Sequence, residues 1–166
     1  MNSSTKKIVM ASLLASLCCV ATMIIKIPSP LKGYINLGDC VVLLTGFTLS
    51  PIYAFLSAGI GSALADMFSG YLLYVPATFL IKGGVALIVA YGFSKIPKNL
   101  PSLIGKIIIC IIAEVFMVLG YYIFEGVLYG FIPSVVNIPA NAIQGVAGII
   151  LGIILSNLFE KHKISL

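Results

Sequence analysis

Three ionisable residues, Asp66, Lys82 and Glu114, lie inside long apolar stretches of the chain. A charged side chain at the centre of a membrane helix costs about 2.5–3.5 kcal/mol on insertion scales, so such residues usually face a bundle interior or a cavity. Asp66 and Lys82 are expected at similar depth in neighbouring helices. They can form a structural ion pair or bind a ligand separately, and both alternatives stay open. Glu114 lies deeper, near the middle of its helix.

Aromatic and amide side chains are expected near one face of the membrane. Six of the eight tyrosines fall on the predicted outer side, whereas an aromatic belt would occupy both interfaces. Asn141 and Gln144 are three residues apart and share a helix face. Together these residues predict an outward-facing site for a small, partly aromatic polar ligand. The candidate binding residues are Asn36, Asp39, Asp66, Tyr71, Tyr74, Lys82, Glu114, Tyr121, Asn141 and Gln144.

No motif indicates an enzyme, a metal site or a bound cofactor. The one histidine, His162, is close to the C-terminus, and the four cysteines form no C-x-x-C pair. The sequence contains no G-x-x-x-x-G-K-[ST] phosphate-binding loop. We therefore expect a non-catalytic protein without metal or cofactor, which cannot supply energy for transport by itself.

The elements that position these residues are membrane helices. The chain has 166 residues, of which 60% are hydrophobic and 9% charged, with a mean hydropathy of +1.16. A soluble domain carries about 25% charged residues, and a membrane helix needs about 20 apolar ones. The apolar runs are continuous, which disfavours a β-barrel. The composition predicts one all-α integral membrane domain over residues 1–166, and no nucleic-acid partner.

Six spans fit the apolar runs. Pro51 divides a stretch that is too long for one helix, and Pro76 suits the first position of the next. Residues 26–39, 69–75, 94–102 and 125–134 are read as connections. The predicted spans are residues 8–25, 37–49, 52–68, 76–93, 103–124 and 136–159.

An even number of spans places both termini on one side of the membrane, and the lysines predict that this side is the cytoplasm. Cytoplasmic loops of membrane proteins carry an excess of positive charge. The cytoplasmic lysines would be Lys6, Lys7, Lys95, Lys98, Lys106, Lys161 and Lys163, with Lys26 and Lys32 outside. A five-span arrangement with an external N-terminus gives the same count. It would require an overlong helix interrupted by proline.

Small residues at four-residue spacing favour close packing of helices. Ala11 and Ala15 lie one turn apart in the first span, and similar residues crowd residues 57–65. The Ala11 and Ala15 face is the candidate surface for a protein partner.

Several segments together resemble the S components of energy-coupling factor (ECF) transporters, small prokaryotic subunits that bind vitamins. The likeness covers nearly the whole chain, and it is strong as an ensemble although each segment alone is weak. It is carried by Ala11-x-x-x-Ala15, Gly33-Tyr-Ile-Asn-Leu-Gly-Asp39, Gly61-Ser-Ala-Leu-Ala-Asp66, Ser69-Gly-Tyr71, Tyr74-x-Pro76-x-Thr78-x-x-x-Lys82-Gly83, Glu114-x-x-Met117-Val-x-Gly120-Tyr121-x-x-x-Glu125 and Pro139-x-Asn141-x-x-Gln144-Gly145.

The resemblance implies six helices, an outer pocket, and loops after spans 1, 3 and 5 that close over the ligand. It implies docking of the Ala11 and Ala15 face on a transmembrane coupling subunit driven by two ATPases. The expected location is the plasma membrane of a prokaryote. The branch suggests hydroxymethylpyrimidine, pyridoxine, pantothenate or riboflavin as substrate. The alternatives are a stand-alone secondary transporter and a membrane scaffold without a ligand.

Overall fold

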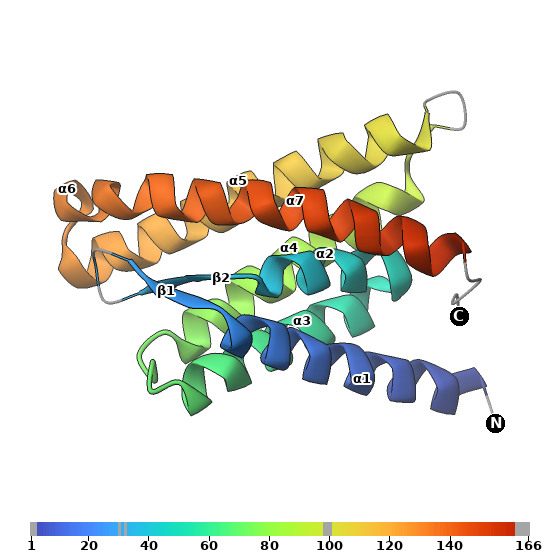
Figure 1. Cartoon of the computed structure of the whole chain (residues 1–166), viewed down its shortest axis with the longest axis horizontal. Coiled ribbons are helices and arrows are strands. Elements are labelled where there is room, and N and C mark those ends of the chain that lie inside the picture. The colour runs from blue at the N-terminus through green and yellow to red at the C-terminus, as the bar shows by residue number, and fades with distance from the viewer. Residues whose placement is uncertain (1–2, 30, 32, 98–100, 162–166) are drawn as a thin grey trace.

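The computed structural model describes residues 3–29, 31, 33–97 and 101–161, and within them the chain is almost entirely helical (Figure 1). Six main helices are joined by short connections, and two short helical turns precede the last of them. The main helices are α1 (Ser3–Ile24), α2 (Gly38–Thr48), α3 (Pro51–Phe68), α4 (Val75–Ser94), α5 (Ser102–Tyr129) and α7 (Ile138–Lys161), and the turns are α6 (Phe131–Ser134) and the 3-10 turn η1 (Val135–Asn137).

Five helical stretches among the described residues are long and apolar enough to cross a membrane, and α2 is the exception. With 11 residues, α2 is about 16 Å long, roughly half of the hydrocarbon thickness. Residues 38–46 are all buried, and α2 packs against α1, α3, α4 and α7. Because protein surrounds α2, it can end inside the bundle at the extended residues Leu49 and Ser50 without exposing backbone to lipid.

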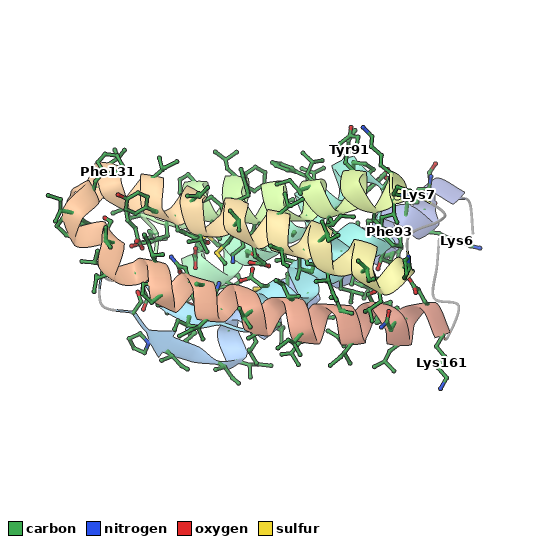
Figure 2. All side chains as sticks on the ribbon, turned by 90° about the horizontal axis from the view of Figure 1, so that it is seen from above. Lys6, Lys7, Tyr91, Phe93, Phe131 and Lys161 are labelled. Carbon is green, nitrogen blue, oxygen red and sulfur yellow. The ribbon has the colours of Figure 1, made fainter. Side chains whose placement is uncertain are left out.

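The bundle has two distinct ends. Lys6, Lys7 and Lys161 gather at one of them, together with Tyr91 and Phe93, and Phe131 lies at the other (Figure 2). We call the first the basic end. The second carries the connections after α1 and α3 as well as α6, and we call it the hairpin end (Figure 1). The described parts of α1 and α7 therefore begin and end on the same side, as an even number of crossings requires.

A small β-hairpin follows α1, where the sequence predicts only a polar connection. Its strands, β1 (Lys26–Pro28) and β2 (Tyr34–Asn36), pair antiparallel with Ile27 opposite Ile35. Three-residue strands are too short to show a clear alternating pattern, so the sequence carries little signal for them. The hairpin holds Tyr34 and Asn36 over the end of the bundle.

Helix α5 is longer than the sequence predicts, and the expected loop over residues 125–134 is wrong. The helix continues through Glu125 to Tyr129 and ends at Gly130, whose φ of 95° suits glycine. Residues Phe131–Ser134 then form α6. The prediction took Glu125 as the exit from the membrane, but its side chain is 2% exposed and hydrogen-bonded inside the protein.

Small residues let α1 and α3 approach closely. The Ser57 hydroxyl donates to the carbonyl oxygen of Ala11 at 2.7 Å. A Cβ added at Gly61 would overlap the carbonyl oxygen of Ala15 and lie 2.7 Å from the Cβ of Cys18. The side chains of Ala11 and Ala15 are half-buried as a result. Large apolar side chains elsewhere on α1, such as Leu13 and Leu17, are exposed on the outside of the bundle.

Candidate substrate-binding site

A small cavity of about 30 Å³ lies at the hairpin end, between the hairpin and the ends of four helices. The hairpin, α3, the connection after α3, α4, α5 and α7 all contribute to its walls. Its lining consists of Ser29, Gly33, Tyr34, Asn36, Asp66, Tyr71, Tyr74, Thr78, Tyr121, Glu125, Asn141 and Gln144.

The structure brings most of the predicted binding residues to this cavity. Those that line it are Asn36, Asp66, Tyr71, Tyr74, Tyr121, Asn141 and Gln144. The other three, Asp39, Lys82 and Glu114, do not line it and are buried within the bundle.

Tyrosine rings form one wall of the cavity. The ring centroids of Tyr34 and Tyr71 lie 4.7 Å apart, and Tyr71 meets Tyr74 edge to face at 6.4 Å. Tyr34 donates from its hydroxyl to Oδ1 of Asp66 at 2.5 Å. Burial, together with the negative charge of Asp66, raises the pKa of the Tyr34 phenol above its ordinary value. Tyr34 therefore remains a hydrogen-bond donor, and it links the hairpin to α3.

Glu125 forms an acidic corner of the cavity. Its Oε1 accepts hydrogen bonds from Nδ2 of Asn137 at 2.8 Å and from the Tyr74 hydroxyl at 3.2 Å. Its Oε2 is buried and has no partner among the described residues. Asn137 also accepts from the backbone N–H of Leu31 at 3.3 Å, so η1 contacts the hairpin turn.

A buried polar network connects the cavity to the charged residues. The ammonium of Lys82 donates to Oδ1 of Asp39, and Nε2 of Gln144 donates to Oδ2 of Asp39 at 2.6 Å. Oε1 of Gln144 accepts from the backbone N–H of Asn36 at 2.8 Å. Both oxygens of Asp39 are therefore paired, and the Gln144 amide is held between the network and the hairpin.

Asp66 and Lys82 do not form the ion pair that the sequence left open as one of two alternatives. Lys82 forms its ion pair with Asp39, and the hydrogen-bond partner of Asp66 is Tyr34. The prediction compared depths along neighbouring helices, but depth does not specify the direction in which each side chain points. Helix α2 packs against α4, and Asp39 lies in the first turn of α2. The Asp39 carboxylate can therefore reach Lys82 on α4.

Glu114 lies in the contact between α5 and α7, where it is 4% exposed. Neither of its carboxyl oxygens has a hydrogen-bond partner among the described residues. A Cβ added at Gly145 would lie 3.1 Å from the Cβ of Glu114, so glycine at this position allows α7 to pack closely against α5.

Five lining residues were not among the predicted binding residues. Tyr34 belongs to the outer tyrosines, and Gly33, Thr78 and Glu125 stand in the segments that carry the family resemblance, so a signal was present for these four. Ser29 stands in a connection that contains proline and glycine. Neither its residue type nor its spacing separates it from other loop residues, so no sequence signal was present for it. The missed residues are Ser29, Gly33, Tyr34, Thr78 and Glu125.

The arrangement suits reversible binding of a small polar molecule. Ring faces offer stacking, and the carboxylates, amides and hydroxyls offer hydrogen bonds. Among the residues that the structure describes, no group of three or more His, Cys, Asp or Glu side chains could hold a metal ion.

Sequence comparison places the chain among transport subunits. Residues 2–161 match the family described as ECF-type riboflavin transporter, S component. An uncharacterised protein of Pyrococcus woesei is 36% identical over 145 residues, which cover 86% of this chain and 94% of that protein. The thiamine precursor transporter HmpT of Lactococcus lactis subsp. cremoris is 24% identical over 165 residues, which cover 98% and 93% of the two chains.

Structure comparison agrees with the sequence comparison. A solved S component of a bacterial ECF transporter superposes with a TM-score of 0.74 and 25% identity, covering 96% of this chain and 98% of that one. The biotin S component of an ECF-type ABC transporter has the same fold, with a TM-score of 0.65, 17% identity, and 96% and 95% coverage.

The segments recognised in the sequence, the six-helix fold and these comparisons agree that this is a multi-pass, non-catalytic membrane subunit of vitamin transport. The chain belongs to the S components of the ECF-type riboflavin transporter family, which bind a vitamin and act with an ECF module.

Proposed function

We propose that this subunit binds a water-soluble vitamin or vitamin precursor in the cavity at the hairpin end. The observation that carries the proposal is the convergence of aromatic and polar side chains from the hairpin, the connection after α3 and four helices on one small cavity. Hydroxymethylpyrimidine, pyridoxine, pantothenate and riboflavin are the candidates. The similarity to a thiamine precursor transporter favours hydroxymethylpyrimidine among them.

Ligand entry requires the site to widen. A cavity of about 30 Å³ accommodates no more than one or two water molecules. The hairpin is the element suited to move, because a few side-chain contacts link it to its neighbours. Lys26 donates to the Ser69 hydroxyl at 2.9 Å, and Tyr34 and Leu31 bond to Asp66 and Asn137.

The hairpin end faces the outside of a prokaryotic plasma membrane, and the basic end faces the cytoplasm. The excess of lysine at the basic end supports this orientation. Lys6, Lys7 and Lys161 are exposed at that end, and the exposed Lys95 follows the end of α4 two residues after Phe93, whereas Lys26 is at the hairpin end. The predicted positions of Lys32, Lys98 and Lys163 lie outside the described residues, as does His162.

Transport requires a transmembrane coupling subunit and two ATPases, and the small-residue face of α1 is where the coupling subunit docks. Ala11 and Ala15 are half-buried against α3, so a partner helix would cover the part of this face that α3 leaves open. Close approach of helices at small residues supports this assignment.

The decisive experiment is uptake into proteoliposomes. The purified subunit, alone or with the coupling subunit and ATPases, is supplied with each of the four radiolabelled candidates. We expect accumulation of one candidate that depends on ATP and on the coupling module. Efficient accumulation by the isolated subunit would identify a stand-alone transporter instead. A protein that neither binds nor accumulates any water-soluble vitamin would contradict the proposal.

A further inference from the structure

Two oxygen atoms that line the cavity have no hydrogen-bond partner. Oε2 of Glu125 and Oγ of Ser29 are both buried and unpaired among the described residues. Buried polar atoms in proteins are nearly always hydrogen-bonded, so each exception needs an explanation. We call Ser29 and Glu125 the acceptor corner.

Gly33 keeps the space at the acceptor corner open. A Cβ added at Gly33 would lie 2.9 Å from Oγ of Ser29 and 3.7 Å from Oε1 of Glu125. Any side chain at this position would occupy the space between the two residues. The backbone N–H of Ser29 donates to the carbonyl oxygen of Gly33 at 2.9 Å, which holds the hairpin turn in this shape.

The hydrogen bonds of Glu125 indicate that its unpaired oxygen, Oε2, can also accept a hydrogen bond. Its Oε1 already receives two donors, Asn137 and Tyr74, as a carboxylate would. These contacts fix the orientation of the carboxyl group, which is 2% exposed. Its Oε2 is therefore a positioned atom with no partner among the described residues, and a ligand that enters the cavity can supply the donor.

The charged side chains that line the cavity are acidic among the described residues. Asp66 lines it in addition to Glu125, and none of the lining residues that the structure describes is a lysine or arginine. Two ammonium groups lie behind the lining: Lys82 is paired with Asp39, and Lys26, which donates to Ser69, lies 6.0 Å from the centroid of the Tyr34 ring. Because Asp66 and Glu125 are both buried, they repel a carboxylate or phosphate group in the cavity more strongly than they would in bulk water.

We propose that the acceptor corner binds an N–H donor of the substrate, so that the substrate is a planar, amino-bearing heteroaromatic compound without a carboxylate or phosphate group. The inference rests on the proposed function and narrows its candidates. The amino group meets Glu125 and Ser29, and the ring lies against the tyrosines.

The test compares matched ligands by isothermal titration calorimetry on the full chain in detergent. The probes are 4-amino-5-hydroxymethyl-2-methylpyrimidine, its 4-methyl counterpart without an N–H donor, its phosphate ester, and pantothenate. We expect the amino compound to bind at least tenfold more tightly than the 4-methyl compound, and the two anions to bind at least a hundredfold more weakly. Equal or tighter binding of the 4-methyl compound, or of either anion, overturns the inference.

Variants locate the effect at the acceptor corner. Glu125→Gln supplies an amide N–H donor, so it should weaken binding of the amino compound at least tenfold and reduce the preference over the 4-methyl compound. Ser29→Ala should weaken binding of the amino compound about threefold, which corresponds to the loss of one weak hydrogen bond. Glu160→Gln, a matched change at the basic end, should leave affinity unchanged. Unaltered affinity and preference in Glu125→Gln overturn the inference.

Ligand binding and ATP-dependent uptake together distinguish a failure of this inference from a failure of the proposed function. If Glu125→Gln does not fold, as judged by its thermal melting, the wild-type ligand series and Ser29→Ala decide the outcome. ATP-dependent uptake of pantothenate would overturn the inference and leave the proposed function intact. Absence of binding and uptake for every vitamin would overturn both.

Discussion

The two ends of the bundle bury polar groups in different ways. At the basic end, Lys106 is 1% exposed, although the sequence placed it among the cytoplasmic lysines. All three of its donors are used, because Nζ lies 2.8 Å from oxygens of Ser156, Asn157 and Glu160. The rings of Phe47 and Phe93 also lie within 6 Å of this ammonium.

At the hairpin end, some buried polar groups do not form all the hydrogen bonds that they could form. Among the described residues, Glu125 and Ser29 each keep a buried oxygen without a partner, whereas both carboxyl oxygens of Asp39 are paired. A satisfied cluster fixes the relative position of helices. A partly satisfied cluster beside a cavity offers hydrogen bonds to a ligand. This difference supports a structural role for the basic end and the binding role that we propose for the hairpin end.

The largest expected effect separates partner docking from ligand binding. Ala11→Trp or Ala15→Trp should abolish ATP-dependent uptake, because a bulky ring prevents close approach of another helix at this face. Ligand affinity at the distant hairpin end should not change. Uptake in proteoliposomes and calorimetric affinity measure the two effects.

Leu13→Trp is the control for this substitution, because Leu13 is 61% exposed on the outside of α1. It should retain uptake and melting temperature. Normal coupled uptake by both alanine variants would exclude this face as the docking surface.

The next largest effect concerns the ion pair under the cavity. Lys82→Met should lower the free energy of unfolding by about 3–5 kcal/mol, because Asp39 is then a buried charge without a cationic partner. Adding Asp39→Asn should recover part of the loss. Denaturant or thermal unfolding in detergent measures this double-mutant cycle.

A second double-mutant cycle, on Asp66 and Lys82, is the control for the cycle on Asp39 and Lys82. Because these residues have different partners, the losses from Asp66→Asn and Lys82→Met should be closer to additive. Stronger coupling in this cycle than in that of Asp39 and Lys82 would contradict the observed pairing.

Removing polar groups from the hairpin end should weaken ligand binding. Gln144→Ala deletes two hydrogen bonds of the network and should cost about 1–3 kcal/mol, or about 5- to 150-fold in affinity. Asn141→Ala, also in the lining, should have a smaller effect. If both variants bind like the parent, the site does not include α7.

The smallest effect is expected at the basic end. Lys106→Met should lower stability by about 1–3 kcal/mol through lost hydrogen bonds. The loss is smaller than at Lys82 because the charged partner, Glu160, is 54% exposed and remains hydrated. Affinity for the ligand should not change. A large loss of affinity would contradict the division of roles between the two ends.

Local sequence signals predict most of the helices. Pro51 and Pro76 lie at the starts of α3 and α4, and apolar runs define their lengths. Most of the candidate site is also predictable, because polar residues that are costly in lipid must face the interior. The hairpin and the end of α5 were missed, since short strands and a buried glutamate look like a loop in the sequence.

The sequence by itself determined that the protein is helical, lies in a membrane and carries its polar side chains toward one end. These properties depend on hydropathy, proline positions and the cost of charge in lipid, all of which are local. Only the tertiary structure decided that Lys82 pairs with Asp39, that Glu125 enters the cavity and that Lys106 is buried. Such contacts depend on how helices are rotated and packed against one another, and residues far apart in the chain determine that packing.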